Sequence, residues 1–540
     1  MTPKKETSKS PASVSPTWPL WLLYAIVMIE GGAVMGIELL GVKMMAPFYG
    51  TTLYVWAGVL TVTLAGLASG YFAGGRIASN FKGNLSAPVI LFTGAVLVFL
   101  MPYTSLWIME STNHLGIRMG SLVAALIFLM PPLICMGMIS PIIIQLATSS
   151  LENTGKIAGM VYALSTLAGI IMTLVTGLYL LPEWGIKSTV LLIASLLGAI
   201  SCISFLIFKK YVPLTGAAIV LVLLFVSQNR AKIFRSDIVW LKDRSEGILG
   251  QITVFDYLDS DKHTMRYMLI NGIPQTYVMP QQNPISSWPY IHRLATMTSG
   301  KPKGARALLI GMAGGTLCME LKSMGFQTDI VEIDPRMPKL AEKYFGFNPE
   351  GFDIYIDDGR HYINTTEQQY DIVIIDVVNG EVQPYHMFTR QAFENLKKRC
   401  TKDAMVVVNF QGYLEGPKSL PIKSLMKTLT HVGFKLKMGY NMGSKDTDGD
   451  ANGDVHLIAY LGEQDFEHNH FDRLNPCCKL LAYDVSEIFM EVPISYADGM
   501  VLEDDLPEFE KLNLAATELW RQKKQKDFME FSKYGFTLYN

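Results

Sequence analysis

The chain has 540 residues, of which 50% are hydrophobic and 17% are charged. Because about a quarter of the residues in soluble proteins are charged, this composition excludes a wholly soluble globular protein. The formal net charge is −2 and the chain has no long basic run, which excludes nucleic acid as the main partner. The six cysteines lack CxxC spacing and neighbouring histidines, so they predict neither a metal site nor a disulfide framework.

Residues 1–17 form a polar N-terminal tail, and residues 18–228 form an apolar region that we expect to be a transmembrane domain of about seven helices. The tail contains no short apolar run with a cleavage site, so no signal peptide is expected. Small residues are frequent in the apolar stretches, as in helices that pack closely in lipid. Three prolines predict a kink in the fourth stretch: Pro131, Pro132 and Pro141. The seven stretches are 18–41, 53–77, 87–107, 120–147, 157–181, 188–208 and 211–227.

The basic residues of the loops bear on the orientation of this bundle. They lie before the first stretch and after the second and the sixth, hence on one side of the membrane: Lys4, Lys5, Lys9, Arg76, Lys82, Lys209 and Lys210. The positive-inside rule makes that side cytoplasmic, and seven spans would then place the C-terminal region outside. The motifs of that region, taken up below, indicate a nucleotide site, and nucleotide cosubstrates are cytosolic. We therefore expect a multi-pass protein of the inner or plasma membrane with a cytoplasmic catalytic domain, which requires an exception to the rule or a re-entrant last segment.

Three ionisable residues, Glu30, Glu38 and Lys43, lie in or beside the first apolar stretch. Charged groups are costly in lipid and are therefore a sign of function by default. In one interpretation Glu38 and Lys43 pair near the interface and hold the bundle together. In the other, these residues belong to a substrate pathway through the membrane.

After residue 229 the pattern changes to short β-type runs that alternate with helical ones. Residues 229–300 are expected to form a small β-subdomain with strands at 251–257 and 267–270. Residues 301–540 contain five further strand patterns, at 305–311, 328–333, 354–356, 372–375 and 405–408. Strands that alternate with helices at this spacing predict an α/β domain with a doubly wound, Rossmann-like parallel sheet.

Three features at the ends of successive predicted strands indicate a nucleotide site. A glycine-rich loop with Gly311, Gly314 and Gly315 follows the first strand, where the absence of a Cβ lets a ligand approach the backbone. Glu332 ends the second strand, where a carboxylate can accept hydrogen bonds from ribose hydroxyls. Asp358 follows the third strand and can meet an adenine amino group.

Asp376 closes the fourth strand of this series, at residues 370–376. A carboxylate beside the nucleotide can accept a proton from an attacking amine, which makes Asp376 the candidate general base. The alternative is that Asp376 only caps the turn that follows the strand.

These motifs resemble the spermidine synthases, and more narrowly the branch of that family that is fused to a membrane domain. The resemblance covers most of the chain from Arg244 to the C-terminus. In the membrane half it includes Gly74-Gly75-Arg76 and Gly137-Met138-Ile139-Ser140-Pro141. In the C-terminal half it includes Leu269-Ile270-Asn271-Gly272-Ile273-Pro274-Gln275, the glycine loop, Asp357-Asp358-Gly359, Pro384-Tyr385-His386-Met387-Phe388-Thr389-Arg390 and Leu502-Glu503-Asp504-Asp505-Leu506-Pro507.

The resemblance implies polyamine biosynthesis, with transfer of an aminopropyl group from decarboxylated S-adenosylmethionine to an amine. Gln275 and Tyr290 would line the reactive arm of the donor, and Gly359 would belong to its adenosine site. Asp376 would deprotonate the amine. Asn379 and Tyr385 would contact the acceptor. The implied partners are the lipid bilayer and a small amine or a membrane-delivered substrate, while a homo-oligomer stays open.

Two positions depart from the pattern of the soluble spermidine synthases. They have an aspartate in the glycine loop that pairs with the ammonium of the donor, and here Ala313 stands there. They also have an aspartate three residues after the base that helps to hold the diamine, and here it is Asn379. Loss of the partner of a buried ammonium typically costs about 3–5 kcal/mol. The nucleoside site is therefore the firmer inference, and the acceptor stays open.

Two other functions remain open at the level of sequence. One is a transferase that uses S-adenosylmethionine itself and moves a methyl or aminocarboxypropyl group to a membrane substrate, which Ala313 favours. The other is a transporter or sensor whose nucleotide domain binds without turnover. The acidic run from Asp446 to Asp454 predicts a hairpin turn that leads into a strand at 455–460, with a calcium loop as the alternative.

Overall fold

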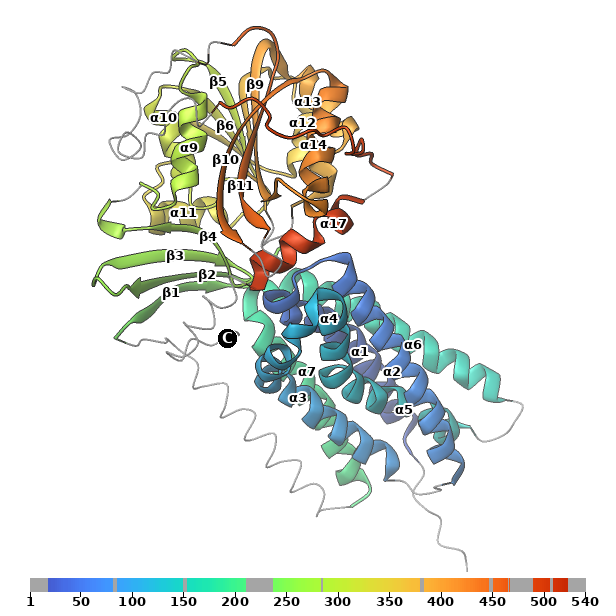
Figure 1. Ribbon diagram of the computed structural model, residues 1–540. Coiled ribbons are helices and arrows are strands. Elements are labelled where there is room, and N and C mark those ends of the chain that lie inside the picture. The colour runs from blue at the N-terminus through green and yellow to red at the C-terminus, as the bar shows by residue number, and fades with distance from the viewer. Residues whose placement is uncertain are drawn as a thin grey trace, which may run out of the picture.

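The computed structural model describes residues 18–80, 85–148, 153–209, 237–282, 285–378, 383–445, 450–464, 466, 489–505 and 508–522. Figure 1 shows a bundle of helices below a domain that contains two sheets. The C-terminal helical segment lies where the two parts meet. The candidate Asn379 and the apolar stretch 211–227 lie outside the described residues.

The bundle consists of α1 (Leu20–Tyr49), α2 (Leu53–Asn80), α3 (Ser86–Thr112), α4 (Gly116–Phe128), α5 (Met130–Ala147), α6 (Thr154–Val175) and α7 (Leu181–Ile207). Within the described part, five helical stretches are long and apolar enough to cross a membrane. They are Leu20–Tyr49, Leu53–Ser79, Ser86–Phe128, Met130–Ala147 and Thr154–Ile207. The last is 54 residues long, and Gly185 breaks it with a φ of 77°.

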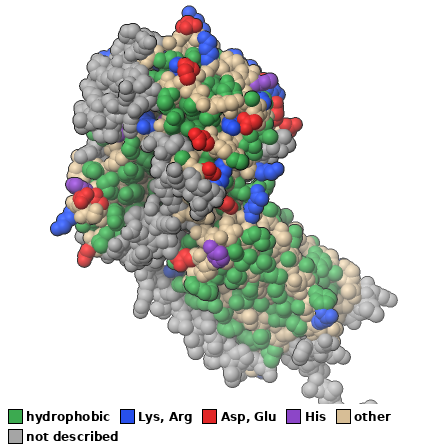
Figure 2. Space-filling view, in the orientation of Figure 1, with side chains coloured by type: hydrophobic (Ala, Val, Ile, Leu, Met, Phe, Trp, Pro, Cys, Tyr) green, Lys and Arg blue, Asp and Glu red, His purple; other side chains and the backbone are tan. Residues whose placement is uncertain are grey.

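The surface of the bundle agrees with a membrane environment. Figure 2 shows hydrophobic side chains spread over it, whereas acidic and basic side chains gather on the other part of the molecule. Leu64, Leu167 and Leu178 are 67%, 51% and 68% exposed. A soluble bundle would bury such residues, so these faces fit contact with lipid.

Two expectations for the bundle need correction. The stretch predicted at 120–147 is two helices, α4 and α5, which meet at Leu129, directly before the prolines that begin α5. Lys43 does not pair with Glu38, because its ammonium donates instead to the carbonyl oxygen of Ile248 in the C-terminal part. Glu30 is buried, and the hydroxyl of Ser165 on α6 donates to it at 3.5 Å.

The small β-subdomain is an antiparallel sheet in the order β1-β2-β3-β4. Its strands are β1 (Val239–Ser245), β2 (Ile252–Leu258), β3 (Thr264–Ile270) and β4 (Ile273–Val278). The strand predicted at 251–257 overlaps β2 with a shift of one residue, and the one predicted at 267–270 lies within β3. The short helix α9 (Pro289–Thr298) leads from this sheet into the larger domain.

The larger sheet has seven strands in the order β10-β11-β9-β8-β5-β6-β7. The strands β5 (Arg306–Ile310), β6 (Gln327–Glu332), β7 (Phe352–Ile356), β8 (Tyr370–Ile375) and β9 (Cys400–Tyr413) are parallel. The hairpin of β10 (Lys435–Lys445) and β11 (Ala451–Tyr460) adds antiparallel strands at one edge. The sheet is thus mixed rather than wholly parallel.

Helices cover both faces of this sheet (Figure 1). They are α10 (Thr316–Ser323), α11 (Met337–Phe345), α12 (Gly359–Thr365), α13 (Arg390–Lys398) and α14 (Leu420–Val432), and α17 (Glu508–Leu512) follows near the C-terminus. Buried residues of the strands alternate between two cores: Leu309 and Ile374 belong to one, and Leu308 and Val373 to the other. The predicted fold, a helical bundle followed by a doubly wound α/β domain, is confirmed.

The bundle and the C-terminal α/β part are held together by specific contacts at their junction. A guanidinium nitrogen of Arg521 donates to the carbonyl oxygen of Ala46 on α1 at 2.9 Å. Glu518 accepts a hydrogen bond from the backbone N–H of Ile117 on α4 at 2.9 Å. The C-terminal helical residues therefore hold α1 and α4 against the domain above them.

The packing of α2 against α5 supplies a first test. A Cβ at Gly70 would lie 2.5 Å from the carbonyl oxygen of Ile134 and 2.8 Å from the Cα of Gly137, whereas a Cβ at Gly75 on the same helix meets nothing within 4 Å. We expect Gly70→Ala to destabilise the protein by about 1–3 kcal/mol through overpacking. Thermal unfolding of the detergent-purified chain measures this. Gly75→Ala is the matched control, and equal melting temperatures of the two variants would contradict the close packing.

Candidate active site

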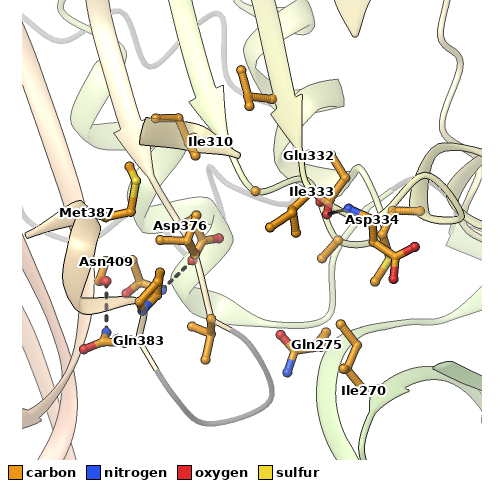
Figure 3. A pocket seen from close by; sticks show the side chains of 18 of the residues that line it. Ile270, Gln275, Ile310, Glu332, Ile333, Asp334, Asp376, Gln383, Met387 and Asn409 are labelled. Carbon is orange, nitrogen blue, oxygen red and sulfur yellow. Dashed lines mark hydrogen bonds between the residues drawn. The ribbon is translucent and has the colours of Figure 1, made fainter. Parts of the chain in front are cut away.

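A cavity of about 280 Å³ lies at the carboxyl ends of the parallel strands. Side chains from the β-subdomain and the large α/β domain line it (Figure 3). Trp520 of the C-terminal segment also lines it. Its position is the one at which open α/β sheets bind ligands. The lining residues include Gln275, Tyr290, Gly311, Ala313, Glu332, Asp358, Gly359, Asp376, Gln383, Asn409, Gln411, Asp454 and Trp520.

The glycine loop follows β5 and brings its backbone against the end of β8. Gly311 has a φ of 89°, and a Cβ there would lie 2.2 Å from the carbonyl oxygen of Asp376. Gly314 donates its N–H to the hydroxyl of Thr276 at 3.0 Å. Gly315, with a φ of 74°, precedes the first residue of α10. Gly311 and Ala313 line the cavity, while Gly314 and Gly315 shape the loop behind it.

Glu332 at the end of β6 organises that loop. Its carboxylate accepts hydrogen bonds from the N–H groups of Met312, at 3.0 Å, and Asp334, at 2.9 Å. Burial raises the pKa of Glu332, and the backbone N–H groups of Asp334 and Met312 act in the opposite direction. A carboxylate has about four acceptor sites, so Glu332 keeps capacity for hydroxyl donors of a ligand in the cavity.

Asp358 is the N-cap of α12 and also lines the cavity. Its Oδ1 accepts from the N–H groups of Arg360 and His361, at 2.9 and 3.1 Å, and its Oδ2 lies 3.0 Å from Nε2 of His386. The hydrogen bond with His386 is the main cause that lowers the pKa of Asp358 to about 2. The carboxylate is therefore ionised at neutral pH and can accept from an amino group.

Asp376 is fixed by two side chains at the other end of the cavity. Nδ2 of Asn409 donates to Oδ1 at 2.8 Å, and the hydroxyl of Tyr290 donates to Oδ2 at 3.3 Å. Burial raises the pKa of Asp376 to about 6, while the hydrogen bonds from Asn409 and Tyr290 lower it. A carboxylate with this pKa is ionised at neutral pH and accepts a proton more readily than an ordinary aspartate.

The remaining sequence candidates lie in different places. Gln275 lines the cavity, and its Nε2 donates to the carbonyl oxygen of Ile273 at 3.4 Å. Tyr385 is not among the described residues that line the cavity, although its neighbours Pro384 and His386 are. Its ring packs instead on the core beside α13 and α14. Gln275 therefore lines the cavity, whereas Tyr385 packs in the core behind the residues that line it.

Several cavity residues had not been singled out from the sequence. Asn409 lies in β9, and Nε2 of Gln383 donates to its carbonyl oxygen at 3.4 Å (Figure 3). Asp454, interpreted above as part of an acidic turn, lies in β11 opposite Gln411. Polar residues at alternate positions of a buried strand, as at Asn409 and Gln411, were the signal that could have revealed this wall.

The fold and the site define a class: a doubly wound α/β domain whose cavity, at the carboxyl ends of the parallel strands, holds carboxylates and a candidate base, joined to an apolar helical bundle. Comparison with known proteins narrows this class. Residues 290–438 match the family model of the spermine/spermidine synthase domain. This part of the chain is therefore similar to the spermine/spermidine synthase domain.

Two curated relatives differ in the reaction that their names give. The polyamine aminopropyltransferase of Vibrio vulnificus is 33% identical over 139 residues, which are 25% of this chain and 46% of that protein. The N-terminal histidine N-methyltransferase of Emericella nidulans is 30% identical over 188 residues, which are 31% of this chain and 33% of that protein. The chain spans less than half the length of both relatives.

Two solved structures match part of this chain. A probable spermidine synthase from Corynebacterium glutamicum is 18% identical, with 42% of this chain and 81% of that chain covered and a TM-score of 0.35. The spermidine synthase from Thermotoga maritima is 15% identical, with coverages of 51% and 87% and a TM-score of 0.32.

The role of Glu332 can be tested by ligand binding. We expect Glu332→Ala to weaken the binding of methylthioadenosine by at least tenfold, because hydrogen bonds to a charged group contribute roughly 1.5–3 kcal/mol each. Isothermal titration calorimetry measures this affinity. Asp353→Ala, an exposed position on the neighbouring strand β7, is the control. Unchanged affinity in folded Glu332→Ala would remove Glu332 from the nucleoside site.

Proposed function

We propose that this chain is a membrane-bound aminopropyltransferase that moves an aminopropyl group from decarboxylated S-adenosylmethionine to an amine acceptor. The observation that carries the proposal is the placement of Asp376, held by Asn409 and Tyr290, in the same cavity as Glu332 and Asp358. A base therefore stands beside the groups suited to a nucleoside.

The chemistry requires one displacement and one proton transfer. The acceptor nitrogen forms a bond to the propyl carbon next to the sulfonium, the carbon–sulfur bond breaks, and methylthioadenosine leaves. Asp376 takes the proton that the nitrogen loses. Asn409 and Tyr290 orient the carboxylate, and Glu332 with the glycine loop would hold the ribose. Gln275 and Tyr290 would flank the reactive arm, and Asn379 would contact the acceptor.

A second function has its own support. Ala313, with a φ of 43°, lines the cavity where a carboxylate would attract the ammonium of the decarboxylated donor. Without that carboxylate the loop also tolerates intact S-adenosylmethionine, which carries a carboxylate of its own. The similarity to a histidine N-methyltransferase points the same way. Methyl or aminocarboxypropyl transfer to a membrane substrate is therefore the alternative, and a nucleotide-binding transporter or sensor would form no product.

Asp376 is the residue whose change tests the proposed mechanism. We expect Asp376→Asn to reduce kcat by about 10²–10⁴-fold, because the amide keeps the size of the carboxylate and cannot take the proton. The affinity for methylthioadenosine should stay within about twofold, which also reports on folding. Asp353→Asn serves as the control. Turnover close to that of the wild type in Asp376→Asn would rule out amine activation by this residue.

The pH dependence follows from the pKa of about 6 of Asp376. Below this pH the carboxylate is protonated and cannot act as a base, so kcat at saturating substrates should fall about tenfold per pH unit. Above it the base is ionised and this limit disappears. The low-pH limb should be absent from the residual activity of Asp376→Asn, and its persistence there would assign the limb to another group.

We further propose that the catalytic domain faces the cytoplasm, because sulfonium nucleosides are cytosolic cosubstrates. The basic residues of the loops predict the opposite orientation under the positive-inside rule. Gly185 lies against Glu246 of the β-subdomain, so α6 ends and α7 begins at the junction. Lys156 at the start of α6 and Lys209 after α7 therefore lie at the remote end of the bundle, which the positive-inside rule would place in the cytoplasm.

Reporter fusions at Asn540 decide the orientation. A cytoplasm-active reporter such as green fluorescent protein should fluoresce there, and a reporter that is active only outside the cytoplasm should be silent. The reverse pattern would place the nucleotide site away from the cytosolic cosubstrate.

A further inference from the structure

A fully buried histidine lies on β11, behind the wall of the catalytic cavity. His456 is not among the described residues that line this cavity, although Asp454, two positions earlier on the same strand, is. In the part of the chain that the structure describes, neither ring nitrogen of His456 has a hydrogen-bond partner. A buried polar group without a partner is unfavourable and uncommon in folded proteins. A neutral imidazole carries one N–H group, so His456 has a hydrogen to donate.

The pairing of β9 with β11 places His456 directly opposite Asn409. Side chains that are directly opposite in an antiparallel pair lie on the same face, with Cβ atoms about 4.5–5.5 Å apart. Val407 and Ile458, the neighbouring pair on this face, belong to a buried core. His456 therefore stands between that core and the cavity, beside the side chain of Asn409.

The amide of Asn409 has an acceptor that matches this donor. Its Nδ2 donates to Oδ1 of Asp376 at 2.8 Å, whereas its own Oδ1 is buried and has no partner among the described residues. A half-turn of the amide would exchange the two atoms and bring an oxygen, instead of an N–H group, against the carboxylate of Asp376. A donor to Oδ1 of Asn409 favours the orientation that the structure has.

The charge state of His456 suits a permanent donor. Burial, and after it the guanidinium of Arg293 on α9, lowers the pKa of His456 to about 3. The ring is therefore neutral at every pH at which Asp376 changes its charge. His456 thus keeps one N–H group and does not itself titrate in that range.

We propose that His456 is a positioning residue whose ring N–H donates to Oδ1 of Asn409 and so keeps the amide N–H of Asn409 on the carboxylate of Asp376. With the Cβ atoms at the separation given above, the two side chains reach each other without a change of the backbone. The inference deepens the proposed function and rests on it, since it names a residue that sets the base of that reaction.

Titration of Asp376 in the full chain in detergent tests this without turnover. Its midpoint is read from the infrared carboxyl bands of protein with isotope-labelled aspartate, and the band of Asp376 is identified by its loss in Asp376→Asn. His456→Phe keeps a ring and removes the donor. We expect it to raise the midpoint by about one pH unit, because the hydrogen bond from Asn409 that lowers the pKa of Asp376 is lost.

The charged and titratable side chains that act on Asp376 or His456 in the described part of the chain stay the same in this variant. They are Tyr290 and Arg293 on α9, Cys318 on α10 and Asp454 on β11. A moved midpoint therefore reports the hydrogen bond from Asn409.

Further variants separate positioning from a general effect of the substitution. Asn409→Ala should raise the midpoint by the same amount, and His456→Phe added to it should change nothing more, because His456 acts through Asn409. His456→Asn and His456→Gln place an amide donor near the positions of Nδ1 and Nε2, and one of them should restore the midpoint. Leu457→Val leaves a small void on the other face of β11 and should lower the melting temperature without moving the midpoint.

An unchanged midpoint in His456→Phe, or a midpoint that the double variant raises further, overturns the assignment. Methylthioadenosine affinity reports folding, and His456→Leu replaces His456→Phe if that variant does not fold. A midpoint that responds as expected while no amine yields a nucleoside product supports the positioning residue and refutes aminopropyl transfer. Product formation with an unresponsive midpoint does the reverse.

Discussion

The approach of the glycine loop to the end of β8 sets the geometry of the whole site. Gly311 lies so close to the backbone of Asp376 that a Cβ would come within 2.2 Å of its carbonyl oxygen. This contact brings the loop that would face a nucleoside and the carboxylate that would accept a proton to one edge of the sheet. Glu332, which binds the N–H of Met312 in the same loop, and Asp376 line the same cavity.

The helical bundle supports this cavity through contacts with the segments that line it. Arg521 and Glu518 hold α1 and α4, and Trp520 between them lines the catalytic cavity. On the other side Lys43 of α1 binds the carbonyl oxygen of Ile248, next to Leu249, which also lines that cavity. The helical bundle therefore supports two walls of the cavity, which gives a physical reason for joining the two parts in one chain.

Much of the nucleoside end of the site could be predicted from sequence, because parallel strands place their carboxyl ends at one edge. Gly311, Glu332, Asp358 and Asp376 each follow a recognisable strand, and all four line the cavity. The ends of the helices in the bundle were harder to predict, because hydropathy does not reveal breaks within an apolar stretch. The break at Leu129 interrupts apolar sequence with more apolar sequence.

The surroundings of Asp376 could not be predicted in this way. Asn409 and Gln383 approach Asp376 only through the pairing of β8 with β9 and the path of the following segment. His456 lies opposite Asn409 only because β11 pairs with β9. Such contacts leave no periodic pattern in the sequence, so a lone glutamine or histidine carries no signal there.

The central claim concerns which group is transferred from the nucleoside donor to the amine. The full-length protein should be incubated with an amine and either decarboxylated S-adenosylmethionine or S-adenosylmethionine, and the nucleoside and amine products identified by mass spectrometry. The account predicts methylthioadenosine and an aminopropylated amine from the decarboxylated donor. Formation of S-adenosylhomocysteine from S-adenosylmethionine, with no product from the decarboxylated donor, would contradict it.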